Sequence, residues 1–197
     1  MRSLVFVWPY AVIFWTAHFW AFAPEFAIVS RARRTVSENK SKDAGSLQLI
    51  LFGMWIALLA SFPLSFVSST RFPASANLPA FIAGTTLLVL GSLLRRHCWR
   101  ILGEYFTGDV QTRADQPVID RGAYRWVRHP SYSGGILMLA GIGLALSNWA
   151  SLATLVVVAV VVYSYRAMVE ERALVQTLGE AYITFMKTRK RFVPFVV

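Results

Sequence analysis

Five apolar stretches, separated by basic or turn-forming segments, constrain this chain more than any other feature of its sequence. They cover residues 3–29, 47–67, 78–94, 133–146 and 149–165. A bilayer core requires about 20 apolar residues of helix, and a lone open strand cannot pair its backbone groups in lipid. We therefore predict an all-α integral membrane protein with about five transmembrane helices.

The short link between the last two apolar stretches predicts a hairpin. Only Ser147, Asn148 and Trp149 lie at this junction. Helices joined by so few residues pack as antiparallel neighbours. The start of the fourth helix should therefore lie beside the end of the fifth, as a C-terminal helical hairpin.

Basic residues orient the predicted helices. Lys and Arg number 5 in residues 30–46, 7 in residues 95–130 and 6 from Arg166 onward, whereas only Arg2 and Arg71 fall on the other side. Basic loops stay in the cytoplasm, so we expect the N-terminus outside and the C-terminus inside. The net charge of +10 is thus explained by the membrane surface rather than by nucleic acid.

Two polar segments fall on the cytoplasmic side in this topology. Residues 30–46 have the composition of a basic, Ser-rich linker at the membrane surface. Residues 95–130 form a 36-residue segment without an apolar span, and it contains several Gly and Pro residues. Long connections in compact proteins are usually functional, so the second segment is the better candidate for a site.

Two clusters carry residues suited to chemistry, one at each side of the predicted hairpin. The first runs from Gly122 to Gly134, where the long loop enters the fourth helix. The second follows the fifth apolar stretch and comprises Arg166, Glu170, Glu171, Arg172 and the run Gly179-Glu180-Ala181-Tyr182. The hairpin should bring Arg128, His129 and Tyr132 close to the second cluster. We therefore expect a cytoplasmic pocket at the membrane surface.

The side chains of this pocket suit a zwitterionic cofactor beside a lipid-like substrate. Carboxylates can hold an ammonium group, arginine can hold a carboxylate through two hydrogen bonds, and a helix start offers free N–H groups to an anion. Pro130 suits the first turn of the fourth helix. Gly134 and Gly135 would let a flat ring or a neighbouring helix approach closely.

Simpler interpretations exist for individual residues. Arg166 and Glu170 are four apart and could form an ion pair on a helix surface, and His129 could be an interfacial histidine. Gly141 and Gly143 have the spacing of helix-packing residues. Packing or interfacial roles suit His18, His97 and Cys98, and three scattered histidines with one cysteine predict no metal site.

The ordered set of motifs resembles the isoprenylcysteine carboxyl methyltransferase family, and related phospholipid methyltransferases share much of it. The resemblance covers residues 84–195. It rests on the RHPSYSG core within Gly122 to Gly134, Glu170-Glu171, Gly179-Glu180-Ala181-Tyr182, the run Leu102 to Thr107, and Arg191-Phe192-Val193-Pro194. The short N-terminal half is typical of the prokaryotic branch.

The resemblance implies a polytopic enzyme that binds S-adenosyl-L-methionine between its last helices and its C-terminal tail. Arg166 and Glu171 fall on an arginine–glutamate pair linked to catalysis in the family. Positions used around the cofactor match Tyr124, His129, Pro130, Tyr132 and Glu170, and from the same motifs we add Arg128, Gly134 and Tyr182. The expected reaction transfers a methyl group to a lipid-like acceptor, with a carboxylate as the favoured group.

The resemblance also suggests a division of the chain. Residues 1–83 would form N-terminal transmembrane helices with a basic loop, and residues 84–197 a methyltransferase-like core with a cytoplasmic tail. The expected partners are the bilayer and a lipid-like or prenylated acceptor, and the expected location is a prokaryotic inner (plasma) membrane.

Several other functions stay open at this point. A phospholipid or small-thiol methyltransferase shares much of the pattern. A membrane scaffold or small transporter would need no cofactor, and a sterol reductase would bind NADPH but has a much longer chain.

Overall fold

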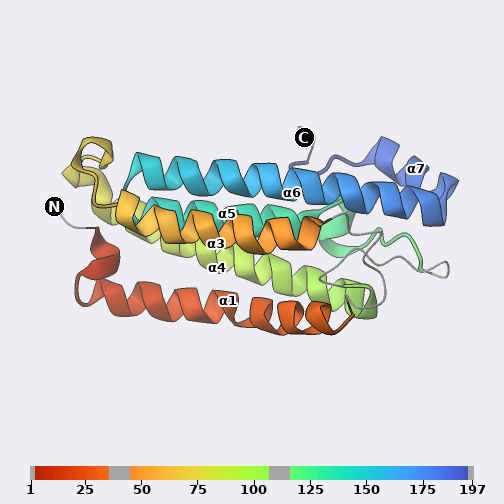
Figure 1. Cartoon of the computed structure of the whole chain (residues 1–197), viewed down its shortest axis with the longest axis horizontal. Helices are drawn as coiled ribbons and strands as arrows, with labels where there is room; N and C mark the ends of the chain where they lie inside the picture. Colours follow the sequence, from red (N-terminus) through yellow and green to blue (C-terminus); the bar gives the residue numbers. More distant parts are fainter. Residues whose placement is uncertain (1–2, 36–44, 107–115, 195–197) are drawn as a thin grey trace.

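The structure is a bundle of helices lying side by side (Figure 1). It is a computed structural model that describes residues 3–35, 45–106 and 116–194, with side chains omitted for residues 26–35 and Glu104. The long helices are α1 (Tyr10–Thr35), α3 (Ser46–Leu64), α4 (Asn77–Leu102), α5 (Pro130–Ala145) and α6 (Trp149–Leu178), and the shorter α7 (Glu180–Thr188) follows α6. Within those ranges the only β-structure is two isolated bridges.

The helices have the length and composition of a membrane protein. Among the described residues, α3, the segment Ala74–Leu102 and α6 are long and apolar enough to cross a membrane, and α5 is a shorter apolar helix. The predicted all-α integral membrane fold is confirmed. The number of helices that cross the bilayer stays a prediction.

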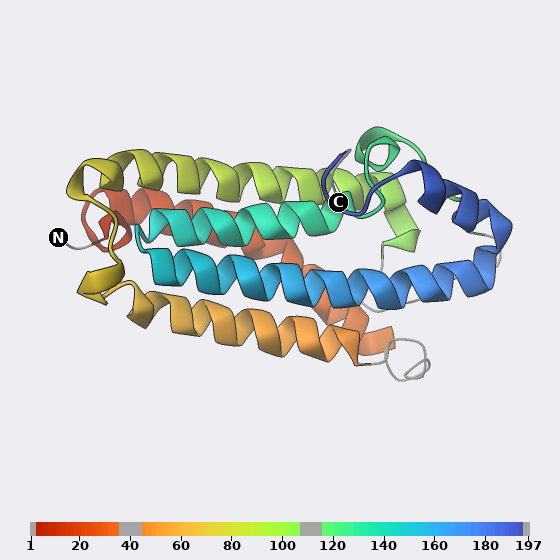
Figure 2. The same ribbon diagram turned by 90° about the horizontal axis from the view of Figure 1, so that it is seen from above.

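The bundle is held together along its length by pairs of neighbouring helices. α4 packs on α5 and α1, and α6 packs on α3 and α5. Figure 2 shows α4, α5, α6 and α3 in succession across the molecule, with α1 crossing behind them. The C-terminal half of the chain therefore supplies the middle of the bundle.

Glycines set the closest helix contacts, as the sequence predicted for Gly141 and Gly143. A Cβ atom on Gly141 would lie 2.5 Å from the Gly84 carbonyl oxygen, and one on Gly143 would lie 2.6 Å from the Leu152 Cα. Small residues of this kind let two helix backbones approach directly in lipid. These glycines therefore allow α5 to pack closely against α4 and α6.

The hairpin between α5 and α6 is confirmed. α5 ends at Ala145 and α6 begins at Trp149. The buried Asn148 side chain caps α6 by accepting hydrogen bonds from the backbone N–H groups of Ala150 and Ser151, at 2.9 and 3.1 Å. A side-chain cap of this kind satisfies N–H groups that a helix start leaves unpaired.

Helix α4 continues past the predicted end of its apolar stretch, because both arginines there have partners. The Arg95 guanidinium donates two hydrogen bonds of 2.6 Å to the Glu25 carboxylate of α1. Arg96 lies over the Trp20 ring, 4.3 Å from its centroid. Paired charges and cation–π contacts let an arginine stay within a helix at the membrane boundary. The helix therefore extends to Leu102.

Other boundaries also differ from the apolar stretches. α1 begins only at Tyr10, after a 3₁₀ turn at Leu4–Phe6 and Pro9, whose ring removes a backbone donor. α6 runs from residue 149 to Leu178, well beyond residue 165. The suggested division between residues 83 and 84 falls inside α4, and the linker residues 36–44 lie outside the described ranges.

Reporter fusions test the orientation of the bundle. Ala74 begins a 3₁₀ turn before α4, at the opposite end of the molecule from α7 (Figure 1). Because 18 of the 20 basic residues fall on one side of the predicted topology, we expect a reporter after Val197 to be cytoplasmic and one at Ala74 to be external. Two reporters on the same side would contradict this topology.

Candidate functional site

The segment before α5 and the C-terminal tail are joined by backbone hydrogen bonds. The N–H groups of Arg128 and His129 donate to the carbonyl oxygens of Lys190 and Arg191, at 2.8 and 2.9 Å. The tail thus returns from α7 to the start of α5, beside the last turns of α6. Side chains from four segments of the chain meet at this end of the bundle.

Glu171 lies at the centre of a buried charge network. Its side chain is 4% exposed, and Arg128 Nε lies 3.0 Å from its Oε1 atom. His129 Nε2 lies 3.1 Å from the same oxygen, and Arg191 Nη2 donates to Oε2 at 2.7 Å. One carboxylate therefore compensates two guanidinium groups and orients the imidazole ring. A buried charge requires such pairing, because isolated it would be very costly.

Glu170, one residue earlier, is connected to a column of rings. The Tyr132 hydroxyl donates to Glu170 Oε2 at 2.5 Å. The Tyr132 ring stacks between those of His129 and Tyr163, with centroid separations of 5.2 and 5.0 Å. The Glu170 side chain is 33% exposed, in contrast to that of Glu171. Its carboxylate is thus accessible to a ligand while being held by Tyr132.

Arg166 lies one turn of α6 before Glu170, and its residue is 3% exposed. Its Nη1 atom donates to the Ser46 hydroxyl at the start of α3, at 2.5 Å. The guanidinium group also interacts with Tyr132. The side chain is therefore held from two sides, and a planar guanidinium fixed in this way can bind a carboxylate in a defined orientation.

A cavity opens among these groups. Water-sized spheres can occupy about 100 Å³ of it, and the space including the solvent at its mouth is about 880 Å³. Charged, phenolic and apolar side chains all contribute to its wall. The lining residues are Leu102, Tyr105, Phe106, Gln116, Pro117, Val118, Ile119, Tyr124, Arg128, His129, Ser131, Tyr132, Arg166, Glu170, Leu174, Leu178, Tyr182 and Phe185.

Two phenols in the wall are kept neutral by burial. Burial, followed by the neighbouring Cys98 and Glu170, raises the pKa of Tyr124 well above its ordinary value. The pKa of Tyr182 is raised by burial and by the two carboxylates Glu170 and Glu171. Both groups therefore act as hydrogen-bond donors near neutral pH, rather than as bases.

Seven of the ten predicted site residues line the cavity, although their roles stay predictions. They are Tyr124, Arg128, His129, Tyr132, Arg166, Glu170 and Tyr182. Pro130 begins α5 and is buried, as its place in a first turn implies. Glu171 lies behind the wall, where it holds the residues that form it.

Gly134 differs from the expectation of a cofactor contact. A Cβ atom added to it would lie 2.8 Å from the Gly91 carbonyl oxygen and 2.9 Å from Arg95 Cγ, both in α4. The absence of a side chain at this position therefore allows α5 to approach α4. Of the two possibilities raised by the sequence, close helix contact is the one that the structure supports.

Sequence reasoning missed several residues of the site. Arg191 was noted only as part of a terminal motif, yet it donates to Glu171. The segment 116–119 and the aromatic pair Tyr105 and Phe106 also line the cavity. Their position in the long polar segment was a signal for function, but nothing in their spacing indicated which of them face the site.

Comparisons with known proteins agree on one family. The sequence model of the isoprenylcysteine carboxyl methyltransferase family matches residues 84–176. The chain is 31% identical over 115 residues to protein-S-isoprenylcysteine O-methyltransferase B of Arabidopsis thaliana, covering 57% of this chain and 58% of that protein. It is also 31% identical over 117 residues to the Saccharomyces cerevisiae enzyme, covering 58% and 49%. The chain thus matches about half the length of these relatives.

The fold is shared with a solved structure of a eukaryotic intramembrane Ras methyltransferase, the isoprenylcysteine carboxyl methyltransferase, determined without a monobody. The TM-score is 0.71 at 21% sequence identity, and the match covers 98% of this chain and 72% of that one. The matched segment 84–176 contains the α5–α6 hairpin and most of the polar cavity wall. This segment of the chain is thus similar to the isoprenylcysteine carboxyl methyltransferase family, and the chain shares the fold of the solved structure.

Proposed function

We propose that this chain is a membrane methyltransferase that uses S-adenosyl-L-methionine to methylate the carboxylate of a lipid-like or prenylated acceptor. The observation that carries the proposal is the position of Arg166 and Glu170 on one cavity wall, within the segment that matches the family. These opposite charges can bind two oppositely charged ligand groups at the end of a membrane helix.

The donor and acceptor groups of the cavity fit the cofactor. Glu170 would hold its ammonium group, since this carboxylate is partly exposed and fixed by Tyr132. Arg128 would face its carboxylate, and the aromatic side chains Tyr105, Phe106 and Tyr124 offer surfaces for its ring system. When bound, the cofactor supplies an electrophilic methyl group on a sulfonium centre.

Arg166 would orient the acceptor. A carboxylate acceptor is already anionic, so the reaction requires no general base. Orientation of two reactants can contribute about 7–11 kcal/mol in favourable cases. Arg166 is buried and anchored by Ser46, so its attraction for an anion is screened less than in water. The acceptor's apolar part would lie among the helices.

The basic segments also support a location for the proposed reaction. Their distribution favours a cytoplasmic α7 end of the bundle and an external N-terminus. In this proposal the enzyme lies in a prokaryotic inner membrane, and the cavity lined by Arg166 and Glu170 opens to the cytoplasm, which contains the cofactor. The acceptor would enter from the bilayer with its polar head at that surface.

Binding of S-adenosylhomocysteine tests the cofactor part of the proposal. S-adenosylhomocysteine, the product formed from the cofactor, should stabilise the detergent-solubilised protein. At a ligand concentration of about 100 times the Kd, the gain in unfolding free energy should be about 2.7 kcal/mol. His129→Ala and Glu170→Ala should each weaken binding, by about tenfold or more for a lost charged hydrogen bond. The measurement is the thermal unfolding midpoint as a function of ligand concentration.

The matched control is Glu180→Ala, which removes an exposed carboxylate outside the cavity wall and should bind like the wild type. Stabilisation by NADPH instead would favour a reductase. No stabilisation by either ligand would favour a scaffold or transporter. Normal binding in both cavity variants would remove His129 and Glu170 from the site.

A further inference from the structure

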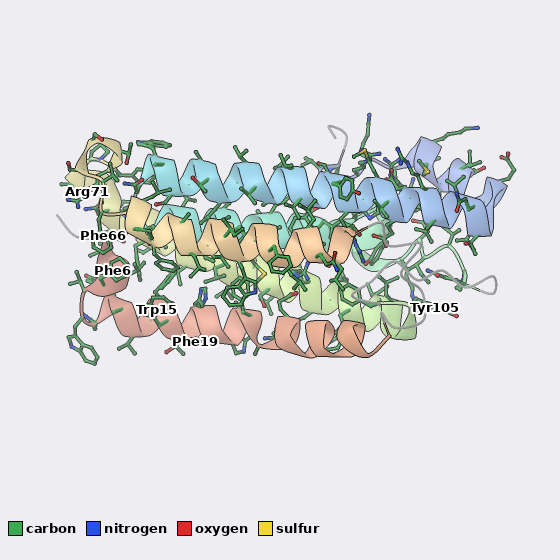
Figure 3. All side chains as sticks on the ribbon, in the orientation of Figure 1. Phe6, Trp15, Phe19, Phe66, Arg71 and Tyr105 are labelled. Atoms are coloured by element: carbon green, nitrogen blue, oxygen red, sulfur yellow. The ribbon has the colours of Figure 1, made fainter. Side chains whose placement is uncertain are left out.

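A second polar cavity lies at the opposite end of the bundle from the candidate site. It is about 290 Å³ in volume and forms where the α5–α6 turn meets the segment between α3 and α4. Figure 3 shows Arg71 at this end, far from Tyr105 at the other. The polar lining residues are Ser3, Ser65, Ser68, Arg71, Asn77 and Ser147.

Two buried donors on this cavity have no partner among the described residues. The Ser147 hydroxyl oxygen is one, and this residue is only 4% exposed. The other is Arg71 Nε, while Nη2 of the same guanidinium donates to the Phe66 carbonyl oxygen at 2.8 Å. A buried polar group without a hydrogen bond costs about 1–3 kcal/mol. A ligand that accepts hydrogen bonds would remove this cost at both atoms.

The charge at this end also lacks compensation. The segments 1–24, 44–103 and 121–169 contain no aspartate or glutamate. They include every residue that lines the cavity. Arg71 is thus a cation without a carboxylate partner from the segments around it, which favours an anionic ligand.

The start of α4 adds to this preference. A 3₁₀ turn at Ala74–Ala76 leads directly into α4, so the helical segment begins at Ala74, and both Ala74 and Asn77 line the cavity. The first turn of a helix presents unpaired N–H groups and a partial positive charge, which together favour anions. A helix start, a guanidinium group and an unpaired hydroxyl therefore converge on one space.

Aromatic side chains around the cavity place it at the level of lipid headgroups. The rings of Phe6 and Phe66 stack with centroids 5.2 Å apart, and those of Phe72 and Trp149 lie 4.5 Å apart. Trp149 is 59% exposed at the first position of α6. Tryptophan is enriched at the membrane–water interface, where phospholipid phosphates lie, and Trp149 is the exposed residue of this kind beside the cavity. We propose that this cavity binds the phosphodiester of a phospholipid headgroup, with Arg71 and Ser147 as donors.

Ligand-dependent stability tests this site independently of methyl transfer. Delipidated protein in a maltoside detergent would be titrated with dioctanoyl-phosphatidylglycerol, with dioctanoylglycerol, which lacks the phosphate, or with inorganic phosphate. The phospholipid should raise the thermal unfolding midpoint, and the other two should not. Arg71→Gln should raise the Kd about tenfold or more, because a charged hydrogen bond is lost.

Two further variants sharpen the test. Ser147→Gly removes the hydroxyl without strain, because Ser147 has a positive φ of 54° that glycine adopts readily. It should also weaken phospholipid binding. Arg172→Gln removes the same charge from an exposed position in α6 and should bind like the wild type. Equal effects of dioctanoylglycerol or of inorganic phosphate would overturn the proposal, as would unchanged affinity in both Arg71→Gln and Ser147→Gly.

Discussion

Replacing Glu171 by glutamine is expected to lower the free energy of unfolding by about 3–5 kcal/mol, the usual cost of leaving a buried charge unpaired. The substitution preserves the shape of the side chain but removes its charge. Arg128 and Arg191 would then share the site with His129 without a carboxylate to compensate them. The measurement is the unfolding midpoint in detergent, together with the susceptibility of the C-terminal tail to proteolysis.

Glu180→Gln is the matched control, because Glu180 is an exposed carboxylate at the start of α7. It should leave the midpoint within about 0.5 kcal/mol of the wild type, as surface substitutions usually do. The family resemblance linked Glu171 to catalysis, whereas its contacts assign it to positioning the tail and His129. If the Glu171→Gln protein were as stable as the wild type but had lost turnover, Glu171 would instead take part directly in catalysis.

Arg166→Ala should lower turnover by about two to three orders of magnitude, as removal of a preorganised electrostatic donor does in other enzymes. S-adenosyl-L-methionine affinity should change far less, since the lost contact is with the acceptor and the transition state. Arg166→Lys should rescue activity only partly, because lysine lacks the planar fork. Methyl transfer and calorimetric cofactor binding measured on the same preparations separate the two effects.

Ser46→Ala provides an intermediate case for Arg166. It removes the hydroxyl that accepts from Arg166 Nη1 but leaves the guanidinium in the cavity wall. Turnover should fall less than in Arg166→Ala, with little change in cofactor affinity. Normal turnover in Arg166→Ala would contradict the proposal that Arg166 orients the acceptor. A loss of activity only in proportion to cofactor affinity would contradict it as well.

Much of the fold could be predicted because hydropathy and turn chemistry are local. The link at residues 147–149 determined the hairpin, and the hairpin brought Tyr132 to Glu170. Helix ends were harder to predict, because they depend on partners far away in the sequence. The path of α4 through Arg95 rests on Glu25, a residue 70 positions earlier.

The site could be predicted only in part for the same reason. Motif residues such as His129 and Glu170 could be identified from their order along the chain. The pairing of Glu171 with Arg191 depends on how the tail folds back from α7, and no local pattern encodes that return. At Gly134 the sequence pattern was ambiguous, because close approach of either a ligand or a helix could explain a residue without a side chain.

Methyl transfer to a chosen acceptor tests the central proposal most directly. The purified protein would be incubated with methyl-labelled S-adenosyl-L-methionine and a farnesylcysteine analogue, with its carboxylate either free or capped as an amide. We expect a base-labile labelled methyl ester from the free acid alone, formed at a rate that Arg166→Ala reduces. Equal labelling of the capped compound, or labelling confined to phospholipids or small thiols, would contradict carboxylate methylation at this site.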